Sequence, residues 1–172
     1  MTIADFKLSP RYSFYDLTVT NNKKLLELNR EEALKFKPTL TALAALLELL
    51  SGPHRLDVNS GFRCWQLNGA TPGSSATSQH PLGQAADLSR LGQLTTDLFA
   101  ELRATVVREK VAFGQLIYEE ARRDHGLSTW VHVSLGRDFW KPDRCGEVRT
   151  MKLDANGKPK YELIETIRPW EA

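Results

Sequence analysis

Apolar residues recur at helical spacing in three parts of the chain. Residues 38–50 follow the i, i+3, i+4, i+7 rule of an amphipathic helix most closely. The leucines that carry this pattern are Leu40, Leu43, Leu46, Leu47 and Leu50. A weaker pattern over residues 23–36 predicts a helix before it, and a third helix is predicted in the later part of residues 89–110. There the apolar positions lie four apart, at Leu94, Leu98, Leu102 and Val106.

Short stretches that alternate or are continuously apolar predict strands. They cover residues 55–61, 84–89, 113–120 and 128–136, with two more, 148–154 and 160–165, in the C-terminal tail. The turn residues Asp124 and Gly126 predict that the third and fourth stretches form an antiparallel pair. Residues 154–157 predict the turn of a second, smaller hairpin. Residues 15–20 predict a short strand or an extended arm.

Residues 64–81 are rich in Gly, Ser, Thr, Asn and Pro, which is the composition of a loop. With helices first and strands afterwards, the pattern predicts an α+β fold. We expect N-terminal helices packed on a small, mostly antiparallel sheet. A length of 172 residues suits a single domain, 1–172. Its parts would be a helical 1–57, a core 58–135 and an unassigned extension 136–172.

Composition and charge exclude few classes of protein. The hydrophobic fraction of 41% and the charged fraction of 26% are those of an ordinary soluble domain. A net charge of +2 gives no reason to expect a nucleic-acid partner. No apolar run reaches the roughly 18 residues of a membrane helix, so no membrane partner is expected either. We expect a monomer.

Two cysteines, Cys64 and Cys145, stand far apart and outside any CxxC or Cys/His cluster. In a chain of this size a disulfide is not needed for stability, so we expect two free thiols in a reducing compartment. The N-terminus lacks a basic start followed by an apolar core, so no secretory signal is expected.

Three side chains suggest a metal site. His80 is followed seven residues later by Asp87 across small, flexible residues, and His132 lies in the alternating stretch WVHVS. Two imidazoles and one carboxylate are a donor set that zinc accepts, with a fourth position left for water. On spacing alone the alternative stays open, because a histidine in a strand is more often structural than a ligand.

Four motifs, in this order, bear on the choice between a metal site and structural histidines: SGFRCWQLN, SSATSQHPLGQAAD, FGQLIYEE and TWVHVSLG. They resemble the zinc D-alanyl-D-alanine carboxypeptidase family, which includes phage endolysin peptidases and has the Hedgehog/DD-peptidase fold. The likeness is greatest to a small phage-associated branch that reads SGYR, SQHxxGxAxD and WxHxS. It covers residues 58–135 well and 1–57 loosely, and it does not extend into the tail after Arg137.

The resemblance implies one Zn²⁺ ion held by His80, Asp87 and His132. It also implies that Arg63 binds a substrate carboxylate or polarises the scissile carbonyl, which suits a guanidinium next to a metal. A surface charge at a strand end is the alternative for Arg63. Ser78 is expected to hydrogen-bond within the His80 loop or to contact substrate. Trp130 would either line the substrate site or pack in the core.

The general base is where this sequence departs from the family pattern. Many relatives have an acidic residue or a histidine three positions before the last histidine ligand, and here that position is Thr129. Glu119 and Glu120 end the preceding strand, and strand alternation allows only one of them to share a face with His132. Glu119 is our preferred base. The alternative is that both glutamates are solvated charges at a strand end. Asp124 and His125, in the following turn, are weaker candidates for the base and are expected to be exposed turn residues.

The resemblance therefore implies a zinc metallopeptidase that hydrolyses peptidoglycan stem peptides, as a carboxypeptidase or as an endolysin endopeptidase of D,D or L,D type. Such an enzyme would be made in the cytoplasm without a signal peptide and would act on the bacterial cell wall, as a phage or prophage product. Two rival hypotheses remain. The chain could be a zinc-containing module that binds the wall without catalysis, or a structural component of a phage particle.

Overall fold

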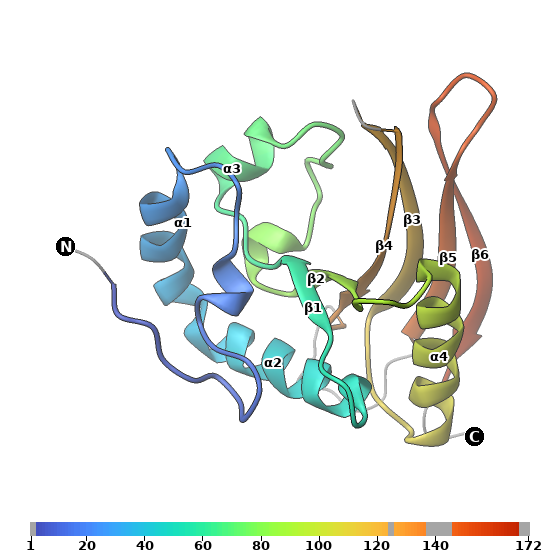
Figure 1. The fold of residues 1–172 in the computed structure, drawn as a ribbon, viewed down its shortest axis with the longest axis horizontal. Coiled ribbons are helices and arrows are strands. Elements are labelled where there is room, and N and C mark those ends of the chain that lie inside the picture. The colour runs from blue at the N-terminus through green and yellow to red at the C-terminus, as the bar shows by residue number, and fades with distance from the viewer. Residues whose placement is uncertain (1–2, 124–125, 137–145, 169–172) are drawn as a thin grey trace. The chain divides into compact units, whose positions relative to one another are not determined.

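The computed structural model describes residues 3–123, 126–136 and 146–168. The chain divides into two compact units, Met1–Asp87 and Leu88–Ala172. Helices come first along the chain and strands later, so the fold is α+β, as the sequence predicts (Figure 1). The strands that the structure describes after α4 (Thr95–Arg108) pair with one another in a single sheet.

The first unit is mainly helical. Its elements are η1 (Asp16–Thr18), α1 (Leu26–Ala33), η2 (Leu34–Phe36), α2 (Lys37–Ser51), β1 (Asp57–Ser60), α3 (Trp65–Ala70), η3 (His80–Leu82) and β2 (Ala85–Ser89), the last of which runs into the second unit. The predicted leucine face of α2 is buried, and Leu40, Leu43 and Leu47 are fully covered. Burial of this apolar stripe is what holds the helix in place, since a helix of this length is marginal by itself.

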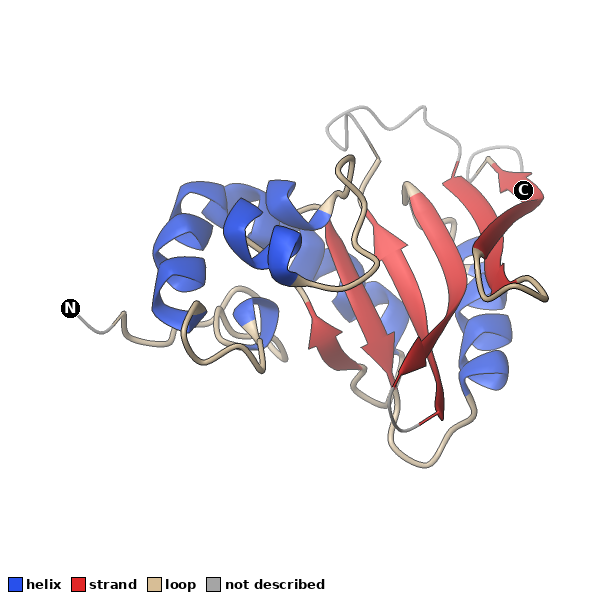
Figure 2. Cartoon of the chain, turned by 90° about the horizontal axis from the view of Figure 1, so that it is seen from above, coloured by secondary structure: helices blue, strands red, loops and turns tan. Residues whose placement is uncertain are grey.

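The second unit contains α4 (Thr95–Arg108), β3 (Gln115–Arg123), β4 (Gly126–Ser134), β5 (Gly146–Leu153) and β6 (Pro159–Ile167). β3 pairs antiparallel with β4 and parallel with β5, and β5 pairs antiparallel with β6. Figure 2 shows the strands in red with this helix in blue. The helix packs on the face of β3 that carries Tyr118, whose ring meets the Phe99 ring edge-on at 6.2 Å.

Most predicted elements are confirmed, including the β3–β4 pair and the turn that joins β5 to β6. Two details of the prediction are wrong. Residues 64–81 are not all loop, because α3 occupies 65–70. Residues 15–20 contain the short 3-10 helix η1 instead of a strand. Within its described residues, the sheet contains one parallel pairing, of β3 with β5, while β3–β4 and β5–β6 are antiparallel, which agrees with the prediction of a mostly antiparallel sheet.

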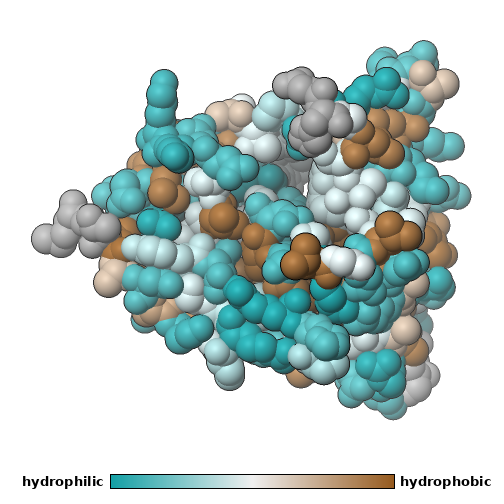
Figure 3. All heavy atoms as spheres, in the orientation of Figure 1, coloured by the Kyte–Doolittle hydropathy of each residue, from teal (hydrophilic) through white to brown (hydrophobic). Residues whose placement is uncertain are grey.

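Surface character fits the composition. On the face drawn in Figure 3, hydrophilic residues cover most of the area and hydrophobic residues form separate small patches. Within the ranges that the structure describes, no helix is both long enough and apolar enough to cross a bilayer. Cys64 is a buried free thiol, as predicted, whereas Cys145 lies outside the described residues.

Candidate functional site

His80 is buried and its ring is oriented by the backbone. The residue opens η3 and is only 2% exposed. Its Nδ1 lies 2.6 Å from the carbonyl oxygen of Gly61, so Nδ1 carries the proton and donates to that oxygen. A histidine held in this way presents Nε2 as a lone-pair donor. A backbone carbonyl on the far nitrogen is the usual support of a metal-binding imidazole.

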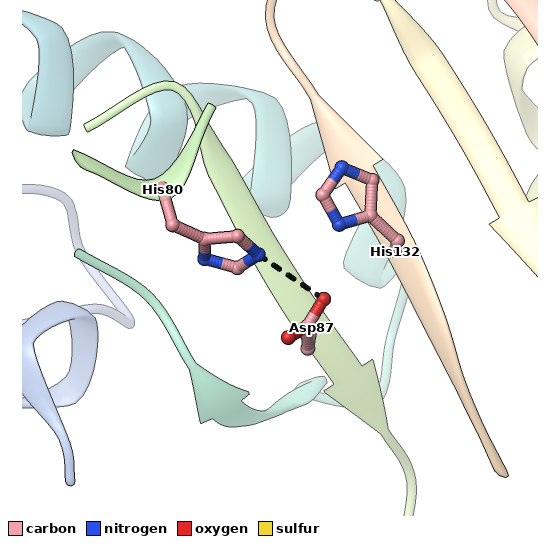
Figure 4. Close-up of side chains that lie close together, drawn as sticks. All are labelled: His80, Asp87 and His132. Carbon is pink, nitrogen blue, oxygen red and sulfur yellow. Dashed lines mark ion pairs between the residues drawn. The ribbon is translucent and has the colours of Figure 1, made fainter. Parts of the chain in front are cut away.

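Asp87 lies on β2 and faces this imidazole. One carboxylate oxygen, Oδ1, is 3.3 Å from Nε2 of His80, the ion pair drawn as a dashed line in Figure 4. Two ligand atoms at bond lengths of about 2.0–2.2 Å from a tetrahedral zinc ion are separated by about 3.3–3.6 Å. The observed separation matches the edge of such a tetrahedron. The side-chain donors of His80 and Asp87 therefore fit zinc without rearrangement.

Gly61 is the acceptor for His80 because the chain passes very close to a neighbouring segment there. A Cβ atom on Gly61 would collide with the carbonyl group of Leu17. The next amide, of Phe62, donates to the same Leu17 oxygen at 2.7 Å. Only glycine permits this close approach, because it has no Cβ atom. The approach fixes the position of the Gly61 carbonyl oxygen, which accepts the hydrogen bond from His80 Nδ1.

Asn29, on α1, holds the other end of the same segment. Its side-chain amide is fully buried and donates to the carbonyl oxygens of Thr18 and Phe62 at 3.3 and 3.1 Å. Its Oδ1 accepts from the Cys64 amide at 2.7 Å. One side chain therefore satisfies three buried backbone groups. A role for Asn29 was not predicted, although a polar residue on the apolar face of α1 was a visible signal.

Arg63 and Ser78 lie next to the His80–Asp87 pair. Nη1 of Arg63 is 3.8 Å from Oδ2 of Asp87, an ion-pair distance that is too long for a hydrogen bond. The Arg63 amide donates to the His80 carbonyl at 3.4 Å, which joins the two segments through the backbone. Ser78 Oγ accepts from the His80 amide at 3.3 Å, so the predicted bond within the loop is present.

His132 lies in the second unit, on β4, and is 8% exposed. It stands opposite Ile117 of β3 in the antiparallel register. Residues directly opposite each other point to the same face of a sheet, so the His132 side chain shares a face with Ile117. Val131 and Val133 point to the other face and are fully buried.

The register also separates the two glutamates. Glu119 stands opposite Trp130 and two residues from Ile117, so Glu119 and Trp130 share the His132 face. Cross-strand diagonal neighbours of this kind have Cα atoms about 7–8 Å apart, within reach of a glutamate side chain. Glu119 is therefore the glutamate that the strand pairing directs to the same side as His132.

Glu120 points to the opposite face, where α4 packs. The phenol of Tyr118 donates to Glu120 Oε1 at 3.2 Å, and the Leu153 amide donates to Oε2 at 3.4 Å. Burial, together with the adjacent Glu120 carboxylate, raises the pKa of Tyr118, so the phenol remains protonated and able to donate at neutral pH. These contacts give Glu120 a structural role on the helix side of the sheet.

Thr129 faces the helix side too. It stands opposite Glu120, and its hydroxyl donates to the Thr95 hydroxyl at 2.8 Å. Trp130 is partly buried, with the Arg123 guanidinium 6.0 Å from its ring centroid. Asp124 and His125 lie outside the described residues.

The donor set matches zinc chemistry. His80 and His132 each offer an imidazole nitrogen and Asp87 a carboxylate oxygen, which are donor types that zinc accepts. Zinc accepts such mixed nitrogen and oxygen ligands, whereas calcium and magnesium prefer oxygen alone. The orienting bond from His80 to Gly61 supplies the outer support that metal-binding imidazoles need.

Comparison with known proteins agrees with this class of site. The model of the Peptidase M15 family matches residues 12–134, well over half of the chain. The chain belongs to the Peptidase M15 family, whose members are zinc-dependent hydrolases of peptide bonds. The matched residues include all three candidate ligands and both glutamates, while β5 and β6 follow the match. No curated protein matches the chain significantly.

Proposed function

We propose that this chain is a zinc metallopeptidase that cleaves a peptide bond in the stem peptides of peptidoglycan. The observation that carries the proposal is the buried His80–Asp87 pair, in which Gly61 orients the imidazole and the two donor atoms are 3.3 Å apart. Membership of the Peptidase M15 family supports the reaction type. His132 is the third proposed ligand, since it supplies the missing imidazole donor.

The chemistry divides among a few side chains. A zinc ion bound here would polarise the scissile carbonyl and lower the pKa of a bound water towards about 7. Glu119 takes the proton from the attacking water and delivers it to the amine that leaves, as a general base and then a general acid. Arg63 stabilises negative charge on the substrate, either a carboxylate or the developing oxyanion. Ser78 and Trp130 are proposed to contact the substrate.

The biological setting is part of the proposal. The substrate would be the cell wall of a bacterium, cut by D,D or L,D action either at a peptide terminus or within a cross-link. A phage or prophage origin, as an endolysin, belongs to this proposed setting. We propose a monomeric enzyme without nucleic-acid or membrane partners.

The test combines metal analysis with mass spectrometry of digested peptidoglycan. The wild-type protein should contain zinc, release new amino termini from purified peptidoglycan and lose this activity in EDTA. His80→Ala should lose both zinc and activity. Glu119→Gln should keep zinc and lose at least about a hundredfold in rate, the usual size of general-base catalysis. Glu120→Gln is the matched control and should stay within a few-fold of wild type.

Two results would contradict the proposal in different ways. Retention of zinc and of lytic activity by His80→Ala would remove the metal assignment. A zinc-loaded wild-type protein that releases no new amines would leave the metal site intact and favour the non-catalytic wall-binding or phage structural module.

A further inference from the structure

The β5–β6 hairpin continues the sheet face that carries His132. In the pairing registers, His132 stands opposite Ile117, Ile117 opposite Arg149, and Arg149 opposite Leu163. These four side chains form one row across four strands, all on the same face. The row lies entirely within the second unit, and its outer half follows the residues that the family model matches.

A second row runs parallel to the first. Trp130 stands opposite Glu119, Glu119 opposite Met151, and Met151 opposite Tyr161. Each row begins with a proposed site residue and ends on the β5–β6 hairpin. Met151 is buried at 7% exposed, so the accessible members of the outer pairs are Arg149, Tyr161 and Leu163, which we call the hairpin ledge.

A β-bulge gives the ledge its outward apolar residues. The register shifts between Val148 and Arg149, so Leu163 pairs with Arg149 while Glu165 pairs with Val148. The extra residue reverses the alternation along β6. Beyond the bulge Ile167 is buried, and Glu165 forms an ion pair with Arg103 of α4.

Before the bulge, the apolar residues Tyr161 and Leu163 of β6 lie on the sheet face that carries His132. Tyr161 is 53% exposed and Leu163 is 51% exposed. The two residues are two positions apart on one strand face, so their exposed apolar parts are neighbours on that face. Without the bulge they would share a face with Ile167, the side that packs in the core.

Arg149 adds a charged contact to the ledge. Glu147 Oε2 accepts from Nε of Arg149 at 3.1 Å and lies 2.9 Å from Nη2, which fixes the plane of the guanidinium. A guanidinium has five N–H donors, so an oriented Arg149 can still bind a second carboxylate. The Arg149 side chain is 30% exposed, enough for a ligand to reach it.

We propose that the hairpin ledge binds the part of the peptide substrate that lies remote from the cleaved bond. The occupant is an extended peptide with a carboxylate for Arg149 and small apolar groups for Tyr161 and Leu163, the chemistry of a stem peptide. Three strand spacings of about 4.8 Å separate His132 from Leu163, so the ledge reaches about 14 Å from the site. That span fits about four extended residues, and the enzyme therefore prefers long peptides to dipeptides.

This inference rests on the proposed function for its choice of substrate, and the experiment separates the two. Two probes are used with the zinc-loaded full chain, an uncross-linked stem pentapeptide and N-acetyl-D-alanyl-D-alanine. The ratio of kcat/KM for the long probe over the short one should fall about tenfold in the Tyr161→Ser, Leu163→Ser double variant. Arg149→Gln should lower the same ratio, mainly through KM. Leu49→Ser, at a leucine that is 60% exposed on α2, is the matched control.

Equilibrium binding of the pentapeptide, followed by calorimetry on the same variants, gives a readout that does not need turnover. Wild type that cleaves neither probe but binds the pentapeptide through Tyr161, Leu163 and Arg149 would refute the hydrolase and keep the ledge. Wild type that cleaves both probes, with an unchanged ratio and affinity in the variants, would overturn the ledge. A lower mass in solution for the double variant with unchanged peptide affinity would also overturn it, because the patch would then bind a second copy of the chain.

Discussion

Gly61 shows how a residue without a side chain can determine the geometry of a metal ligand. Replacing it with alanine would force its new Cβ against the Leu17 carbonyl, so the backbone must move and the acceptor for His80 Nδ1 must move with it. We expect Gly61→Ala to cost about 2–4 kcal/mol in the free energy of unfolding and to weaken zinc binding. Urea denaturation and chelator competition measure the two effects.

Gly69 provides the control for that change. It lies in α3, and a Cβ atom there would meet nothing within 4 Å. Gly69→Ala should therefore leave zinc affinity unchanged and should stabilise the protein slightly, by up to about 1 kcal/mol. Equal losses in both variants would mean that the close approach at Leu17 does not matter.

A substitution at Asn29 tests the buried hydrogen bonds directly, because aspartate keeps the shape of the side chain and removes its N–H donors. Asn29→Asp retains the acceptor for the Cys64 amide but places a carboxylate oxygen against the carbonyls of Thr18 and Phe62. We expect a loss of about 3 kcal/mol in the free energy of unfolding, since a buried charge would face two acceptors. Asn21→Asp, at an exposed position, should change it by less than about 0.5 kcal/mol.

These residues also mark what the sequence can and cannot reveal about the site. His80, Asp87 and Arg63 belong to a motif whose residue types and spacing suggest their chemistry, so they could be selected in advance. Gly61 and Asn29 act through an approach to Leu17 and Thr18 that is distant in the chain. No local pattern encodes that approach, because it depends on how the helices pack.

At the scale of elements, a partly buried carboxylate joins the N-terminal arm to α2. Glu48 accepts hydrogen bonds from the Ser9 hydroxyl at 2.8 Å and from the amide and Nε of Arg11 at 2.5 and 2.6 Å. Burial alone would raise the pKa of Glu48, but the bonds from Arg11 and Ser9 outweigh it and hold the pKa below its ordinary value. The carboxylate form is therefore favoured in the folded protein.

A depressed folded pKa means that this stabilisation is present above the ordinary pKa of glutamate and is lost as pH falls through the folded value. Glu48→Gln should therefore cost about 1–2 kcal/mol at pH 7 and clearly less at pH 3, as measured by urea denaturation at the two pH values. The control is Glu32→Gln, which affects an exposed pair with Lys35 and should cost under about 0.5 kcal/mol. An equal cost of Glu48→Gln at both pH values would contradict the assignment.

Long elements with a regular apolar pattern could be predicted from the sequence, whereas short or irregular ones could not. The leucine pattern of α2 and the alternation in β3 and β4 are long enough to indicate both type and place. α3 was missed because it has only six residues, WQLNGA, and includes glycine and asparagine, which favour loops. The bulge in the β5–β6 pair was missed for another reason. Nothing in the tail sequence says on which side of Arg149 the register shifts.

For the molecule as a whole, the proposed zinc site should appear as a linkage between metal and stability. A ligand that binds only the folded state raises the free energy of unfolding by RT ln(1 + [L]/Kd), about 4 kcal/mol when free zinc exceeds Kd a thousandfold. For a chain of 172 residues this corresponds to a rise in Tm of about 10 °C. Thermal unfolding with buffered zinc, followed by circular dichroism, measures the shift without reference to catalysis.

Histidine variants test which side chains are responsible for the zinc-dependent rise in Tm. His132→Ala should remove most of the zinc-dependent rise in Tm, because two protein ligands bind zinc far more weakly than three. His54→Ala, which removes an exposed histidine, should retain the full shift. Magnesium should produce no shift in wild type, since it prefers oxygen ligands and the proposed set contains two imidazoles. An identical zinc shift in wild type and His132→Ala would exclude His132 as a ligand, while the His80–Asp87 pair would still be tested by His80→Ala.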